Sequence, residues 1–188
     1  MSDSGIVYNN FFQKEYVCLS INQKTSMSKS RISKLDAGDK IILPPSALDL
    51  LTKFNAQTPF TFVLRNKKND NEIVYAGVIE FTAPEKIVYV PSWMMSILKI
   101  QNKTKLFVDS VNIPKATNVV FKVGSIIAEK TNPTDILEYV LRDKLILHED
   151  MVLYISFLDK IICIEVQKTN PSYYVRINDV DLEYSIVA

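Results

Sequence analysis

The sequence predicts a mainly β chain with short helices, in which a closed barrel precedes a smaller α+β subdomain. Most of the 188 residues lie in short runs rich in Ile, Val, Tyr and Phe that end at Pro, Asn, Asp or Lys, a pattern typical of strands. One strand–helix–strand unit occurs twice between residues 40 and 112. After Pro114 one capped helix is followed by several strands, which is typical of α+β folds.

The expected strands are dominated by β-branched and aromatic residues. They are residues 16–21, 40–43, 60–64, 73–81, 87–90, 105–111, 151–157, 161–166 and 173–177. Residues 22–39 are rich in Ser and Lys without an apolar period, so we expect a solvated loop there. The basic residues of this loop are expected at the surface rather than in a binding site. They are Lys24, Lys29, Arg31 and Lys34.

Three short helices interrupt the strands. They follow Ser46, follow Ser92 and begin at Asn132. Ser46 and Asn132 are expected to cap their helices, because their side chains can accept hydrogen bonds from the free backbone N–H groups at a helix start. Pro133 then stands at the first helical position, where it loses no hydrogen bond.

An internal repeat carries the barrel prediction. The segment IILPPSALDLL (41–51) resembles VYVPSWMMSIL (88–98), and their Pro-Ser steps are 46 residues apart (91 − 45 = 46). At the same offset TFVLRN (61–66) falls on FVDSVN (107–112). Two such units cannot each bury their apolar faces alone. We therefore expect them to interlock into one closed barrel with pseudo-twofold symmetry, which removes free sheet edges; coincidence between two similar units is the alternative.

The change of pattern after the repeat sets the domain boundaries. We expect a flexible tail over residues 1–13, the barrel over residues 14–122 and the α+β subdomain over residues 123–188. The connection between the last two contains Pro114 and Gly124.

Charge and cysteine content narrow the function classes. Lys and Arg number 22 and Asp and Glu 21, a net charge of +1, whereas nucleic-acid binders carry a clear basic excess. Cys18 and Cys163 form no CxxC pair, which excludes a zinc ribbon or a thioredoxin-like site and fits a reducing compartment. No apolar run approaches the ~20 residues of a membrane span, and the start is polar. The cytosol or nucleus is expected.

No set of residues points to catalysis. An Asp-Ser-Gly triplet at residues 3–5 matches the aspartic-protease motif once, but those enzymes need two facing carboxylates. A Gly-Ser pair at residues 124–125 is a very weak signal for a pyruvoyl self-cleavage site, and a simple turn is the alternative. His148 is the only histidine, and a triad or metal site needs it to converge with further groups. We expect a binding protein without cofactor or metal.

Five segments in the same order closely resemble the amino-terminal domain of the ubiquitin fusion degradation protein 1 family. They are KIILPPSALDLL (40–51), AGVIEF (76–81), VYVPSWMMSIL (88–98), VDSVNIPKAT (108–117) and TNPTDILEYVLRD (131–143). The ending NDVDLEY (178–184) resembles the family's acidic last strand. The resemblance implies a double-psi β-barrel followed by a small mixed α/β subdomain, and the 46-residue repeat is what such a barrel leaves in a sequence.

The resemblance also implies a function. Family members pair with the nuclear protein localisation 4 protein and bring ubiquitin-tagged substrates to the valosin-containing AAA ATPase for extraction and proteasomal degradation. They do so in the cytoplasm and nucleus, and at the endoplasmic reticulum through partners. The amino-terminal domain binds ubiquitin and polyubiquitin chains. The implied role is a non-catalytic adaptor; a peptide- or ATPase-binding module without ubiquitin affinity is the alternative, and an enzyme on the same barrel ranks third.

The chain departs from the family pattern in several places. Gly38-Asp39 stands where the family has Gly-Gly, Ser92 where it has histidine and Glu149 where it has glycine. The chain also ends at Ala188, without the family's ATPase-docking motifs and partner-binding segment. We expect either a cut piece or a naturally short member.

The matched motifs are mostly structural, and contact residues are harder to name. Trp93, Met94 and Met95 have the spacing of a helix entry and a core, so burial is expected. A surface for ubiquitin is expected to be small and apolar with a polar rim. The candidates for ubiquitin contact are Tyr173 and Tyr174, because side chains alternate along a strand and one of the two therefore faces solvent.

Overall fold

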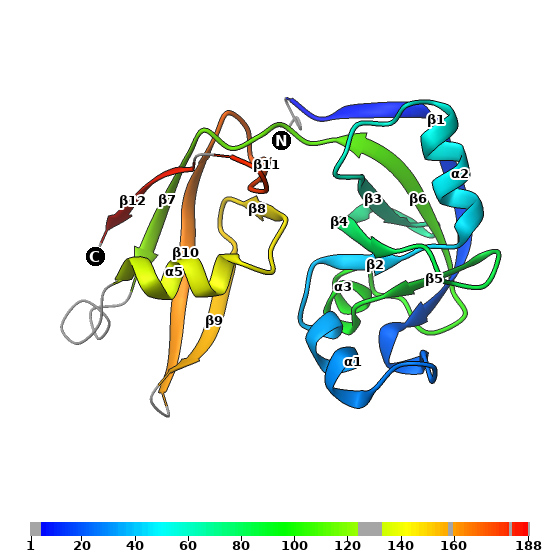
Figure 1. Cartoon of the computed structure of the whole chain (residues 1–188), viewed down its shortest axis with the longest axis horizontal. Coiled ribbons are helices and arrows are strands. Elements are labelled where there is room, and N and C mark those ends of the chain that lie inside the picture. The colour runs from blue at the N-terminus through cyan, green and yellow to red at the C-terminus, as the bar shows by residue number, and fades with distance from the viewer. Residues whose placement is uncertain (1–4, 124–132, 158–159, 181, 188) are drawn as a thin grey trace. The chain divides into compact units, whose positions relative to one another are not determined.

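The chain divides into two compact units. One is Val7–Asn112, and the other is Ile113–Ala188 together with Met1–Ile6. Figure 1 shows the computed structural model, in which the first unit wraps its strands around a centre and the second combines strands with a helix. The residues that the structure describes are 5–123, 133–157, 160–180 and 182–187.

The first unit is a closed six-stranded barrel. Its strands follow one another around the barrel in the order β1-β5-β2-β4-β3-β6. Its elements are β1 (Val7–Ser20), η1 (Ile21–Gln23), α1 (Lys29–Asp36), β2 (Lys40–Ile42), α2 (Pro45–Lys53), β3 (Thr61–Asn66), β4 (Asn69–Glu80), β5 (Ile87–Val90), α3 (Ser92–Ile97) and β6 (Lys105–Asn112).

The strand pairing of the barrel is twofold symmetric. β1 runs parallel to β5 and β2 parallel to β4, whereas β1–β6 and β4–β3 are antiparallel. Exchanging β2 with β5, β3 with β6 and β4 with β1 therefore reproduces the barrel order. Between β3 and β6, Val63 faces Asp109 at the offset of the sequence repeat (109 − 63 = 46). The predicted fold class, a mainly β chain with short helices and a double-psi β-barrel, is confirmed.

Large apolar side chains fill the barrel. Phe62 and Leu64 of β3 are fully buried. The centres of the Phe12 ring of β1 and the Phe62 ring are 5.5 Å apart. The two helices of the repeat add Leu51 from α2 and Met94 from α3 to the same core. Burying a side chain of this size contributes about 1.5–3 kcal/mol. The helices after the two Pro-Ser steps are therefore part of the barrel core.

The expected loose tail is wrong over residues 7–13, which form the first half of β1. Its polar residues are satisfied by a partner strand: Asn9 Nδ2 donates to Ser110 Oγ (2.9 Å) and to Asn112 Oδ1 (3.3 Å) of β6. The ladder between β1 and β6 also shifts register within this stretch, which breaks the alternation that would identify a strand.

The expected loop over residues 22–39 contains a helix, α1, which is a correction to the sequence prediction. Ser28 caps this helix by accepting a hydrogen bond from Arg31 N (3.4 Å). None of its residues is fully buried, and only Ile32 and Leu35 pack against a small apolar cluster. So few apolar residues leave no clear helical period in the sequence.

Lys24, in the same segment, was expected at the surface and is instead buried, at 7% exposure. Its Nζ donates to Thr82 O (3.3 Å) and lies 5.1 Å from the centre of the Tyr89 ring. A buried ammonium needs such partners. Because they come from distant segments, the local sequence does not reveal them. The other basic residues of the segment are exposed, as predicted.

The start of α2 is stabilised differently from the prediction. Pro44 occupies the cap position and makes no side-chain hydrogen bond. Ser46 Oγ donates to Glu85 Oε2 (2.6 Å), and Ser46 N donates to Glu85 Oε1 (3.4 Å). The Glu85 carboxylate, from the segment before β5, thus accepts the hydrogen bond from a backbone N–H at the helix start that Ser46 was expected to accept. The other predicted cap, Asn132, lies outside the described residues.

The second unit contains a four-stranded sheet, a two-stranded ribbon and a helix. The sheet order is β12-β7-β10-β9, and the ribbon pairs β11 with β8. The barrel boundary expected after residue 122 is wrong, because β7 pairs with β10 and β12. The elements are β7 (Asn118–Val123), α5 (Pro133–Leu141), β8 (Ile146–His148), β9 (Val152–Phe157), β10 (Lys160–Asn170), β11 (Tyr174–Arg176) and β12 (Glu183–Val187).

One face of the four-stranded sheet forms the core of the second unit. Ile136 and Leu137 of α5 pack with Phe121 of β7 and Ile164 of β10. Val175 of β11 belongs to the same cluster. Because strand side chains alternate, the neighbouring residues of β9 and β10 point to the opposite face.

Candidate functional site

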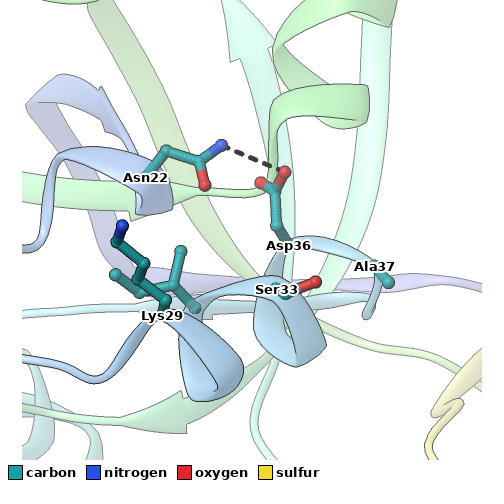
Figure 2. A pocket seen from close by; sticks show the side chains of 6 residues that line it. Asn22, Lys29, Ser33, Asp36 and Ala37 are labelled. Atoms are coloured by element: carbon teal, nitrogen blue, oxygen red, sulfur yellow. Dashed lines mark hydrogen bonds between the residues drawn. The ribbon is translucent and has the colours of Figure 1, made fainter.

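A hollow of about 520 Å³ with a mixed polar and apolar lining lies beside η1 and α1 in the first unit (Figure 2). The side chains that line it contain one carboxylate and one ammonium group, and no histidine or cysteine. They belong to Asn22, Lys29, Ile32, Ser33, Asp36 and Ala37. Figure 2 shows the Asn22 amide pointing toward the Asp36 carboxylate, to which it is hydrogen-bonded.

Polar groups at this hollow form hydrogen bonds to Ser92 at the start of α3. Asp36 Oδ1 accepts a hydrogen bond from Ser92 N (2.7 Å), and Asp36 Oδ2 accepts one from Asn22 Nδ2 (3.1 Å). Asn22 Nδ2 also donates to Ser92 Oγ (2.9 Å), which lies 3.1 Å from Ser20 Oγ. A carboxylate at a helix start is stabilised by the free N–H groups there. Asp36 therefore has a structural role.

His148 does not converge with catalytic partners. It ends β8, its Nδ1 lies 2.7 Å from Glu149 O, and its ring stacks on that of Tyr173. Apart from Gly5, the triplet at residues 3–5 and the pair at 124–125 lie outside the described residues. Within the described ranges, no group of three or more His, Cys, Asp or Glu side chains could hold a metal ion. None of the helices described there has the length and apolar character to cross a membrane.

The predicted candidates Tyr173 and Tyr174 lie beside His148, which the pairing of β11 with β8 brings to them. The ring centres are 5.0 Å apart for Tyr173 and Tyr174, 5.8 Å for His148 and Tyr173, and 5.2 Å for His148 and Tyr174. Each of the three side chains is half-buried. We call this group the ring cluster.

A second surface, missed by sequence reasoning, is the side of β9 and β10 that faces away from the core. We call it the outer face and define it by Val152, Tyr154, Ile161, Cys163 and Glu165. Tyr154 is 70% exposed and Ile161 is 77% exposed. Cys163 pairs directly across from Tyr154, and Glu165 across from Val152, so these side chains lie on one side of the sheet.

A signal for the outer face is present in the sequence. A strand with one buried face alternates apolar and polar residues, but VLYISF (152–157) and IICIEV (161–166) are apolar at most positions. The buried set is Leu153, Ile162, Ile164 and Val166. Apolar residues on the other side must then be exposed, and an exposed apolar cluster marks an interaction site.

The fold and these shallow surfaces define the class: a double-psi barrel module with a second, sheet-containing unit. The family model for "Ubiquitin fusion degradation protein UFD1, N-terminal subdomain 1" matches residues 12–114. The chain belongs to the ubiquitin fusion degradation protein 1 family.

Curated relatives match a longer part of the chain. It is 36% identical over 177 residues to the Homo sapiens ubiquitin recognition factor in ER-associated degradation protein 1. The aligned region covers 94% of this chain and 57% of that relative. The chain is 35% identical over 163 residues to Saccharomyces cerevisiae ubiquitin fusion degradation protein 1, which covers 85% of this chain and 44% of that relative. The chain therefore spans about half of the length of these relatives.

Proposed function

We propose that this chain is a non-catalytic adaptor domain that binds ubiquitin chains. With the nuclear protein localisation 4 protein, it helps deliver ubiquitinated proteins to the valosin-containing AAA ATPase for extraction and proteasomal degradation. Family membership supports this role, as does the relatives' name, ubiquitin recognition factor in ER-associated degradation. The same proposal locates the chain in the cytoplasm and nucleus, and at the endoplasmic reticulum through partners.

The outer face is the observation that carries the proposal. Ubiquitin presents a shallow apolar patch, and a complementary surface is small, apolar at its centre and polar at its rim. Tyr154 and Ile161 supply an exposed apolar centre. Glu165 pairs across from Lys122 of β7 beside them and supplies a charged rim. Tyrosine is also among the residues enriched at interface hot spots.

Tyr173 and Tyr174 belong to a different surface. They lie at the ribbon of β11 and β8, whereas the outer face lies on β9 and β10. Because the outer face exposes more apolar side chain, we assign ubiquitin to it. Ubiquitin contact at the two tyrosines stays a prediction that the titrations below test separately.

The carboxylates at the hollows of the first unit support a non-catalytic role. Asp36 is bonded to the start of α3. A second hollow of about 270 Å³ includes Glu85, whose carboxylate holds Ser46 at the start of α2. On the barrel strands, the buried Asp109 carboxylate forms an ion pair with Arg65. Each of these acids is engaged in holding the fold together.

Calorimetry with mono-ubiquitin and with a tetra-ubiquitin chain tests the proposal. We expect the chain to bind tetra-ubiquitin at least about tenfold more tightly per ubiquitin, because a second weak contact forms at high effective concentration. The net charge of +1 predicts a modest salt dependence.

Two outcomes would count against the proposed binding of ubiquitin chains. Equal affinity per ubiquitin unit removes the avidity argument. Binding to the isolated amino-terminal domain of the ATPase, without binding to either form of ubiquitin, makes the chain a peptide- or ATPase-binding module instead.

A further inference from the structure

The ring cluster lies next to two carboxylates. Glu149 and Asp150 follow His148 directly in the chain, and Asp150 is exposed. Within the part of the chain that the structure describes, neither forms an ion pair. Burial, and then the charges of Asp150 and Glu149, raise the pKa of Tyr173. The negative potential of the two carboxylates therefore reaches the Tyr173 hydroxyl.

The backbone that carries the rings is held in place by buried hydroxyl groups. Thr169 Oγ1 donates to Ser172 O (2.7 Å) and to Tyr173 O (2.9 Å), while Ser172 Oγ donates to Tyr174 O (2.5 Å). Glu149 N also donates to Tyr173 O (3.3 Å), which joins the acidic turn to the tyrosines. Thr169 and Ser172 are buried. A surface fixed in this way loses little conformational entropy when a partner binds.

Rings and carboxylates side by side suit a cation. Aromatic faces attract a cation through their quadrupole, and a planar guanidinium can stack on a ring while it hydrogen-bonds a carboxylate. We propose that the ring cluster, with Glu149 and Asp150, is a binding site for an arginine side chain carried by a peptide segment of a partner protein. This site goes beyond the proposed function, because it is separate from the outer face and its ligand is not ubiquitin.

A blocked peptide, Gly-Gly-Arg-Gly-Gly, is the probe, and the same peptide with citrulline in place of arginine is its uncharged control. NMR follows the titration of the full labelled chain through the ring signals of His148, the only histidine. The arginine peptide is expected to shift these signals in a saturable way. The citrulline peptide is expected to bind at least about fivefold more weakly, since it lacks the charge.

Two pairs of variants separate binding from folding. Tyr173→Phe keeps the ring and is expected to keep the affinity, whereas Tyr173→Leu is expected to lose about fivefold. Asp150→Asn is expected to weaken binding about threefold. Asp179→Asn is its matched control, because Asp150 and Asp179 are both exposed and both have positive φ, 64° and 50°, a conformation that asparagine tolerates. It is expected to change nothing.

Four results would overturn the site. The first three are equal shifts with the citrulline peptide, unchanged binding in Tyr173→Leu, and His148 signals that ubiquitin moves but the arginine peptide does not. The third result would assign the ring cluster to ubiquitin. Absence of peptide binding together with normal ubiquitin binding would remove this site and leave the proposed function standing.

Discussion

Replacing Ile161 with glutamate is expected to weaken ubiquitin-chain binding about thirtyfold or more while the fold is kept. A residue at the centre of an interface contributes 2 kcal/mol or more when it is a hot spot, and ~1.4 kcal/mol corresponds to a tenfold change. A buried, unpaired carboxylate in the complex adds a desolvation cost. Ile161 is 77% exposed in the free chain, so the new charge stays solvated there and the native state is not strained.

Ile79→Glu is the matched control. Ile79 is also an exposed isoleucine on a strand, at 44% exposure, but it lies on β4 of the barrel. Calorimetry against tetra-ubiquitin should find wild-type affinity for this variant. Equal losses in both variants would mean that the added charge acts non-specifically, and no loss in Ile161→Glu would remove the outer face from the binding surface.

Trp93→Ala is expected to destabilise the barrel by about 3 kcal/mol, the low end of the range for truncating a buried aromatic side chain. Trp93 is half-buried against the barrel core, and its Nε1 donates to Gly38 O (2.8 Å) just before β2. The substitution therefore removes both packing and a hydrogen bond that links α3 to the segment just before β2. Met94 and Met95 beside it are buried, as the sequence predicted.

Urea denaturation followed by far-UV circular dichroism measures this effect, because Trp93 is the only tryptophan and its fluorescence is lost in the variant. Trp93→Phe is the control: it keeps a ring in place and loses the hydrogen bond, for an expected cost of about 1–2 kcal/mol. A wild-type midpoint for Trp93→Ala would show that Trp93 does not support the barrel and would make it a candidate contact residue instead.

The parts of the fold that the sequence revealed are those with local, repeated signals. The strand at residues 87–90 has the predicted bounds, and α2 and α3 begin at the two Pro-Ser steps, at Pro45 and Ser92. The repeat predicted a closed barrel, and its offset of 46 residues recurs in the pairing of Val63 with Asp109.

The elements that escaped prediction depend on distant partners. Residues 7–13 were predicted to be a tail because the hydrogen-bond partners of Asn9 lie on β6, far along the chain, and are not visible in the local sequence. Lys24 reads as a surface residue because Thr82 O and the Tyr89 ring, which hold it, lie far along the chain. β8 has only three residues, too few for an apolar period to show.

The candidate sites follow the same rule. The run of apolar residues in β9 and β10 contains the signal for the outer face, although its exposure emerges only when the sheet core is known. Tyr173 and Tyr174 could be named from the sequence. Their neighbour His148 could not, because the two segments meet only through the pairing of β8 with β11.

The rate at which Cys163 is alkylated, with and without tetra-ubiquitin, shows whether ubiquitin covers the outer face. Cys163 is exposed on the outer face, while Cys18 is buried and burial raises its pKa to about 12, so Cys18 contributes little reactive thiolate. If ubiquitin covers the outer face, a saturating amount of tetra-ubiquitin slows Cys163 alkylation at least about tenfold. An unchanged alkylation rate at a concentration where calorimetry shows full binding would mean that ubiquitin binds elsewhere than on the outer face.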